Sequence, residues 1–245
     1  MASGIPQQSI KRLASLPRGA PLDVASLQAI GVSPSLASHY VRAGWLTRLG
    51  RGSFMFPGDR LDPAASIKTL SGHLPGLHVG GKTALAWRGI RHNVGPSELL
   101  VLWGEKVAGL PEWFTKRFPA RYISRRLFDT TLPVDFGLQT LPETPNGPSV
   151  SVPERALLEL LSDVGVTQGL EEARNIMESV RSLRGETLDT LLTHCPRVKV
   201  VRLCLNLADQ LGLSWAAEAR KSSGPRGRGR WIRKMPDGST LILKP

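Results

Sequence analysis

The strongest constraint on the fold of this chain is the sequence Gly-Val-Ser-Pro at residues 31–34. Glycine often ends a helix in the left-handed conformation, whereas serine followed by proline is a strong helix start. These four residues therefore predict a turn between two helices, one over 22–29 and one over 34–43. Apolar residues spaced along 9–16 predict a further short helix before them. Together the segments predict a small unit of three helices.

The helix predicted over 34–43 has two unlike faces. One face gathers small, polar and basic side chains within about 100° of arc, because each residue advances by about 100°. Its members are Ser35, Ser38, His39 and Arg42. The opposite face is apolar and can pack on the two preceding helices. Its members are Leu36, Ala37, Tyr40 and Val41.

The segments that follow this helix predict a hairpin. Residues 45–49 and 53–56 alternate as strands do, and Gly-Arg-Gly at 50–52 places an arginine at the tip. Two helices, a turn, a third helix with a polar face and a basic hairpin are the order of a winged helix-turn-helix. In that fold the third helix enters the major groove of DNA, where small polar residues allow a close approach. The alternative is a small helical subdomain whose polar face is only solvated.

The distribution of charge also favours a nucleic-acid partner. The 245 residues include 32 Lys+Arg and 20 Asp+Glu, which gives a net charge of +12. Residues 1–60 contribute +5 and residues 216–245 contribute +6, whereas residues 151–215 sum to −2. A positive excess concentrated at the two ends points to a polyanion such as double-stranded DNA. The hydrophobic share of 41% excludes a mainly disordered basic protein.

We expect the DNA contacts to come from the third helix, the hairpin and the basic C-terminal segment. Arg42, Arg48 and Arg51 would hold phosphates or probe the minor groove. The candidate DNA-binding residues are Ser33, Ser35, Ser38, His39, Arg42, Arg48, Arg51, Arg226, Arg228 and Arg230.

The middle of the chain contains a match to a phosphate-binding loop that we interpret differently. Residues 76–83 fit the pattern G-x-x-x-x-G-K-T. Such a loop must follow a buried strand, but here the apparent strand, 78–79, falls inside the loop. The simpler interpretation is a strand, a Gly-Gly junction and a helix over 82–89. We therefore expect no enzyme, and nucleotide-binding or nuclease activity is the less favoured alternative.

The rest of the chain predicts a mixed α/β region. Strands are expected over 99–103, 121–124 and 136–140. A capping box at 151–154 should open a helix, because its serine and glutamate can bond each other's backbone amides. Further helices are expected over 169–181 and 197–212, and the latter is apolar nearly all round, as a central buried helix is.

The predicted fold class is α+β, with two domains. An N-terminal winged helix-turn-helix domain covers residues 1–60. A mixed α/β C-terminal domain with a small sheet and a helical cluster covers residues 61–245. This second domain ends in a basic hairpin at 226–245, with strands over 226–234 and 241–243 and a turn at 236–238. The hairpin could be a second nucleic-acid contact, a docking surface for an acidic protein, or a solvated edge that resists aggregation.

We expect neither a metal nor another cofactor. His194, Cys195 and Cys204 match no zinc-ligand spacing and lack a fourth ligand. The two cysteines fit a reducing compartment. The start of the chain lacks an apolar signal core, and no run of about 18 apolar residues occurs. These features predict a cytoplasmic protein without a membrane contact.

Three sequence blocks, at 40–52, 78–85 and 151–160, together resemble the AbiEi antitoxins. These proteins are transcriptional regulators of type IV toxin–antitoxin systems. The resemblance covers most of the chain and implies a winged-helix domain that binds inverted repeats in its own promoter. It also implies a C-terminal domain that opposes a nucleotidyltransferase-like toxin, by a functional rather than a stable contact, and it supplies no catalytic site. A regulator without a toxin is the main alternative.

Overall fold

The computed structural model describes residues 7–90, 99–105, 107, 109–224, 227–234, 238 and 240–244. The contacts between residues divide the chain into two compact units. The first unit comprises Met1–Leu74 and Gly109–Phe118, and the second comprises Pro75–Ala108 and Pro119–Pro245.

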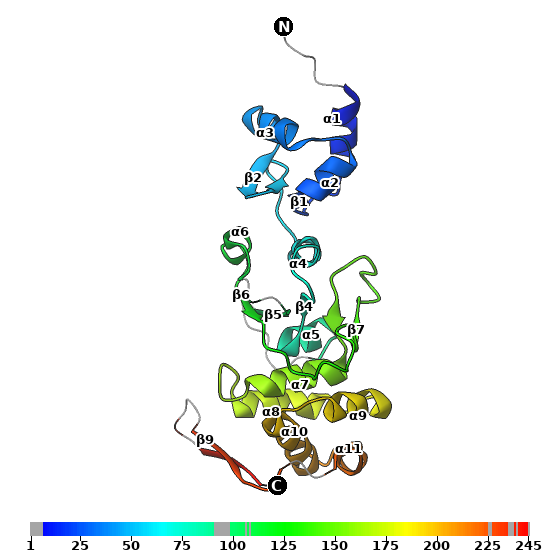
Figure 1. The fold of residues 1–245 in the computed structure, drawn as a ribbon, viewed down its shortest axis with the longest axis vertical. Coiled ribbons are helices and arrows are strands. Elements are labelled where there is room, and N and C mark those ends of the chain that lie inside the picture. The colour runs from blue at the N-terminus through cyan, green and yellow to red at the C-terminus, as the bar shows by residue number, and fades with distance from the viewer. Residues whose placement is uncertain are drawn as a thin grey trace. The chain divides into compact units, whose positions relative to one another are not determined.

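The first unit is a winged helix-turn-helix, as the sequence predicts. Its elements are α1 (Gln7–Ala14), β1 (Leu22–Asp23), α2 (Val24–Ala29), α3 (Pro34–Arg42), β2 (Thr47–Gly50), β3 (Ser53–Met55), α4 (Pro63–Ser71) and α6 (Glu112–Thr115). The strands form an antiparallel sheet in the order β1-β3-β2. Figure 1 draws α1 to α4 and the three strands in blue to cyan, with α3 above β2, and α6 in green. The apolar face of α3 enters the core, where Ala37 and Tyr40 are buried with Leu27 and Phe54.

The helix predicted over 22–29 begins two residues later than expected. Leu22 and Asp23 instead form a short strand, paired with Phe54 and Ser53. The Asp23 carboxylate accepts a hydrogen bond from the backbone N–H of Ser26 at 2.7 Å, which caps α2. The apolar spacing alone could not reveal this pairing because the partner strand lies about thirty residues further along the chain.

The second unit is a mixed five-stranded sheet covered by helices. Its elements are β4 (His78–Val79), α5 (Gly81–Trp87), β5 (Leu100–Trp103), β6 (Ala120–Ile123), β7 (Leu138–Gln139), β8 (Val150–Ser151), α7 (Pro153–Asp163), α8 (Leu170–Ser179), α9 (Gly185–Thr193), α10 (Val198–Gln210), α11 (Ala216–Ser223), β9 (Trp231–Lys234) and β10 (Thr240–Leu243). The sheet order is β6-β5-β4-β8-β7, with parallel pairs β5/β6 and β4/β8.

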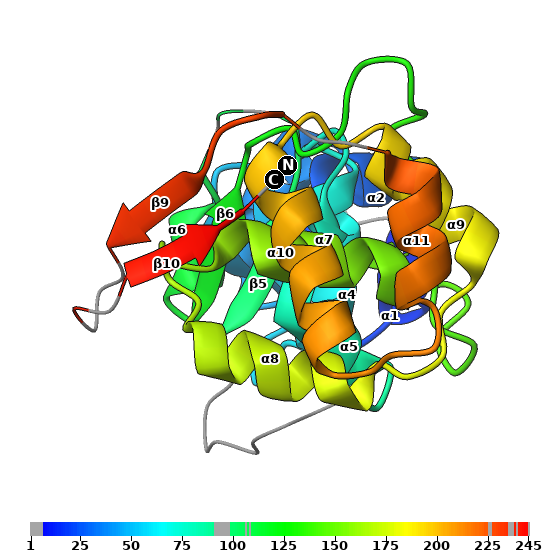
Figure 2. The same cartoon turned by 90° about the horizontal axis from the view of Figure 1, so that it is seen from below.

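Helix α10 is the central buried helix that the sequence predicts. Figure 2 shows it crossing α7, with α11 beside it. Most of its side chains are buried, including Val201, Leu203 and Cys204. Strands β9 and β10 form the terminal hairpin, in a register that pairs Trp231 with Leu243. The helical cluster and the small sheet confirm the predicted fold class.

The first strand of this hairpin begins at Trp231, so the described residues 227–230 precede it rather than forming its start, and Arg226 lies outside the described residues. The cause is a buried arginine, Arg202, which donates to the carbonyls of Gly227 and Gly229 at 2.9 and 2.5 Å. Most of the turn predicted at 236–238 lies outside the described residues.

The capping box predicted at 151–154 is wrong. Val152 is the N-cap residue of α7, and no side chain bonds the first turn there. The Ser151 hydroxyl lies in β8 and donates to the buried Glu159 carboxylate at 2.8 Å. The Glu154 carboxylate accepts from the guanidinium of Arg184 at 2.9 Å and from its backbone N–H at 2.7 Å. Both side chains are therefore drawn to tertiary partners.

Candidate nucleic-acid interface

Helix α3 begins at a serine cap. The Ser33 hydroxyl accepts a hydrogen bond from the backbone N–H of Leu36 at 3.2 Å and lies 2.9 Å from the Ser35 hydroxyl. Pro34 occupies the first helical position, where its missing N–H costs nothing. Ser33 therefore holds the start of the helix in place, and Ser35 is exposed beside it.

A second contact fixes the hairpin against α3. The Ser38 hydroxyl donates to the carbonyl of Pro34 at 3.0 Å and accepts from an Arg48 Nη at 3.4 Å. The Arg48 guanidinium also lies over the Phe54 ring, 5.1 Å from its centroid. Arg48 is thereby held next to the polar face of α3, and the residue is exposed.

Three further candidates, His39, Arg42 and Arg51, are exposed. Within the described part of the chain, none of the three lies in a salt bridge. His39 and Arg42 are three residues apart and thus share one face of α3. Arg51 stands at the tip of the hairpin between β2 and β3, residues 50–52, which we call the wing.

The acidic residues of the first unit all bind local partners. Asp23 and Asp62 cap helices, Asp59 binds Arg18 at 2.6 Å, and Glu112 binds Lys116 at 2.7 Å. Burial raises the pKa of Asp23, but hydrogen bonds from Ser26 and His73 outweigh it, and the net shift is downward. In the described part of this unit, no carboxylate offsets the positive charge of α3 and the wing.

The base of the wing rests on a helix from a distant part of the chain. A Cβ added at Gly50 would lie 3.1 Å from Cδ1 of Trp113, so only glycine fits easily between β2 and α6. Trp113 is 6% exposed. Gly52 has a φ of +71°, which favours glycine, and it completes the turn around Arg51. The sequence carries no signal for this contact, because 109–118 shares no pattern with the hairpin.

The C-terminal candidates lie in the second unit. Arg228 and Arg230 are exposed, on a segment whose backbone carbonyls are held by the buried Arg202. Arg226 lies outside the described residues. Of the three C-terminal candidates, the structure thus places Arg228 and Arg230 at a surface.

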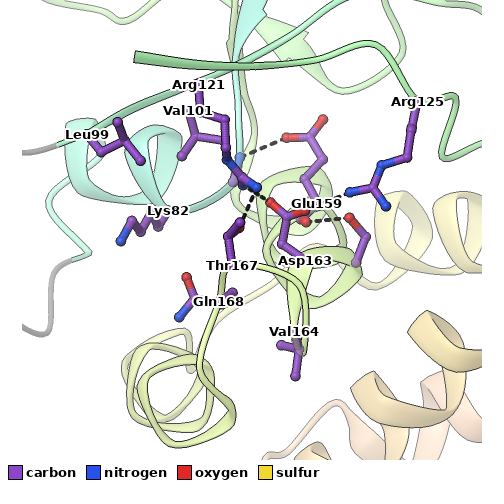
Figure 3. A network of polar contacts seen from close by, with 12 residues as sticks. Lys82, Leu99, Val101, Arg121, Arg125, Glu159, Asp163, Val164, Thr167 and Gln168 are labelled. Atoms are coloured by element: carbon purple, nitrogen blue, oxygen red, sulfur yellow. Dashed lines mark hydrogen bonds and ion pairs between the residues drawn. The ribbon is translucent and has the colours of Figure 1, made fainter. Parts of the chain in front are cut away.

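The apparent phosphate-binding loop at 76–83 is filled by a carboxylate of the chain itself. The backbone N–H of Gly81 donates to Glu159 at 2.9 Å, where a phosphate would have to bind (Figure 3). His78 and Arg155 also contact this carboxylate, at 3.0 and 2.9 Å. Strand β4 lies inside the motif, as the simpler interpretation requires.

Among the described residues, no group of three or more His, Cys, Asp or Glu is placed to hold a metal ion. Cys195 and Cys204 are both buried thiols, and burial raises the pKa of Cys204 to about 12. No helix in the described ranges is long and apolar enough to cross a membrane.

The first unit defines the class of protein, because a helix-turn-helix followed by a hairpin wing is the winged helix-turn-helix fold. The family follows from two matches. Residues 7–95 match the AbiEi antitoxin N-terminal domain of transcriptional regulators, and residues 97–241 match the AbiEi antitoxin transcriptional regulators of type IV toxin–antitoxin systems. The chain therefore belongs to the AbiEi antitoxin family.

A solved structure has the same fold. The crystal structure of the RV2827C protein from Mycobacterium tuberculosis is 16% identical, with a TM-score of 0.60. The alignment covers 89% of this chain and 81% of that protein. No curated protein matches the sequence.

Proposed function

We propose that this chain is a sequence-specific DNA-binding repressor that regulates its own operon through inverted repeats in the promoter. The observation that supports this most is the exposed, uncompensated positive charge on α3 and the wing. His39, Arg42 and Arg51 have no acidic neighbours in the described part of the unit. A DNA phosphate backbone bound at this surface would supply the negative charge that the protein lacks there.

The proposed roles follow from the position of each side chain. Ser35 and His39 lie on the exposed face of α3 and would reach base edges in the major groove. Arg42, Arg48 and Arg51 would hold phosphates or enter the minor groove, which positions the helix without reading sequence. Ser33 and Ser38 would act mainly through the helix cap and through Arg48.

These roles can be tested by fluorescence anisotropy with two DNA duplexes. One duplex comes from the DNA upstream of the gene, and the other has an unrelated sequence. We expect His39→Ala to weaken binding to the upstream duplex by about 1–3 kcal/mol, and to the unrelated duplex very little. Arg42→Ala should weaken both equally. Lys68→Ala, which removes an exposed cation of α4, is the matched control. Equal losses for all three variants would contradict the assignment.

We also propose that the protein opposes a nucleotidyltransferase-like toxin and is not itself an enzyme. Membership of the AbiEi antitoxin family supports this role. The test is co-expression with a nucleotidyltransferase-like reading frame beside the gene. The double variant Arg42→Ala/Arg51→Ala should lose repression of a reporter but still restore growth. Failure of the wild-type protein to restore growth would contradict the antitoxin role and would indicate a regulator without a toxin.

A further inference from the structure

The second unit contains a cavity with an unusual charge. It has a volume of about 340 Å³ and lies among the end of β6, the start of α10 and strand β9. Five cationic side chains line it: Arg125, Arg126, Arg197, Lys199 and Arg233. None of the described lining residues is acidic. We call it the cationic cavity.

Among the described residues, two of these cations have a carboxylate partner. Arg125 binds the buried Asp163 at 2.9 Å, as Figure 3 shows, and Arg126 binds Glu105 at 3.2 Å. Neither carboxylate lines the cavity.

The other three cations have no salt-bridge partner in the part of the chain that is described. Arg197 donates to the carbonyl of Arg126 at 3.3 Å. Lys199 donates to the carbonyls of Ser162 and Val164 at 3.0 and 2.6 Å. These neutral acceptors orient the two side chains, and the nearby Asp163 carboxylate offsets only part of the charge of Lys199.

The cationic side chains of the cavity repel one another, and this repulsion raises the free energy of the protein when no anion is bound. Burial, together with repulsion from Arg233 and other neighbouring arginines, lowers the pKa of Lys199 to about 8. A bound anion would remove this repulsion. The start of α10 adds to the effect, because its first turn has neither an acidic residue nor a capping side chain to neutralise the helix dipole.

The remaining lining is aromatic and aliphatic. Trp231 is partly buried, with Lys199 Nζ 5.7 Å from its ring centroid. Trp103, Leu127 and Val198 add apolar surface. The volume is at the lower end of small-molecule sites, and a few convergent polar groups in an apolar lining are typical of them. A ligand that combines an anion with a planar ring matches both parts of the lining.

We propose that the cationic cavity binds a nucleoside 5′-phosphate, with the phosphate at Arg197, Lys199 and Arg233 and the base against Trp231. This ligand site is separate from the proposed DNA interface, which lies in the first unit. It is also separate from the motif at 76–83, whose amide is occupied by Glu159.

Strand β9 offers a matched pair of variants. Its side chains alternate, so that Trp231 and Arg233 are partly buried, whereas Ile232 and Lys234 are exposed. Arg233 lines the cavity and Lys234 does not. Arg233→Ala and Lys234→Ala therefore remove the same charge from opposite faces of one strand, and circular dichroism melts check that both variants fold.

Calorimetric titration of the full chain with AMP, GMP, CMP and UMP tests the proposal, with inorganic phosphate and adenosine as the two halves of a ligand. We expect at least one nucleotide to bind one to one and more tightly than either half. Arg233→Ala should weaken this binding about tenfold or more, because it removes a charge-assisted contact. Lys234→Ala should change it less than twofold.

The proposal would be overturned if no nucleotide bound at millimolar concentration, if the two variants had equal effects, or if phosphate bound as tightly as every nucleotide. Binding of a single-stranded oligonucleotide without any mononucleotide binding would also overturn it and would indicate a nucleic-acid surface. None of these results bears on DNA binding by the first unit, so the two proposals fail independently.

Discussion

The packing of the second unit depends on the side chain of Glu159. Its buried carboxylate accepts hydrogen bonds from Gly81, Ser151, Arg155 and His78. A Cβ at Gly80 would lie 2.4 Å from one of its oxygens, so a side chain there would displace it. Burial raises the pKa of this group, but the charge and hydrogen bond of His78, with help from Arg155 and Gly81, lower it to about 2.

The substitution Glu159→Gln should lower the free energy of unfolding at pH 7 by about 3 kcal/mol, because it leaves buried partners without their charge. In the wild type, the stabilisation by the ionised carboxylate is complete above the ordinary pKa of 4.5 and is lost as the pH falls toward about 2. Denaturant titrations between pH 7 and pH 3 should therefore show a shallower acid loss in the variant. Glu105→Gln, at an exposed pair, is the control. Parallel pH profiles for the wild type and Glu159→Gln would contradict this account.

The two cysteines should be protected from thiol reagents in the folded protein. Both are buried, and the pKa of Cys204 is raised to about 12 by burial, so the reactive thiolate is scarce. At pH 8, we expect a colorimetric thiol reagent to label neither residue while the protein is folded, and both in guanidinium chloride. Rapid labelling of either thiol in the native protein would contradict its burial, and labelling of Cys204 would show that α10 is accessible to solvent.

At the scale of elements, the sequence predicts helices with strong local signals and misses contacts made at a distance. Helix α3 follows from Ser33 and Pro34, whose cap and fixed φ act within one turn. Strand β1 exists only because β3 pairs with it, and the capping box fails because Glu159 lies eight residues beyond Ser151. The same limit applies to α6, which joins the first unit from beyond residue 108.

Helix α6 should contribute to the stability of the wing. We expect Trp113→Ala to destabilise the first unit by about 3 kcal/mol, because it leaves a cavity against Gly50. Hydrogen exchange measured by mass spectrometry should then be faster in peptides covering β2 and α3 and unchanged in α10. Glu112→Ala on the same helix removes only an exposed pair and should have little effect. Unchanged exchange in Trp113→Ala would mean that α6 does not support the wing.

At the scale of the whole molecule, the sequence predicts where charge lies along the chain but not how the fold regroups it. The candidate residues of α3 and the wing could be selected because they are close in sequence. The cationic cavity could not be predicted from the sequence, since Arg125, Lys199 and Arg233 come from three distant segments that only the fold brings together. Whether the arginines at 226–230 bind DNA also stays a prediction.

The salt dependence of DNA binding tests the central claim, that α3 and the wing bind the phosphate backbone. The slope of log affinity against log salt should be shallower by about 0.9 in Arg42→Ala and in Arg51→Ala, and by about 1.8 in the double variant. The reason is that fewer counterions are released from the DNA when a phosphate contact is lost. Lys68→Ala should keep the wild-type slope. Slopes that do not change in the double variant would contradict the claim.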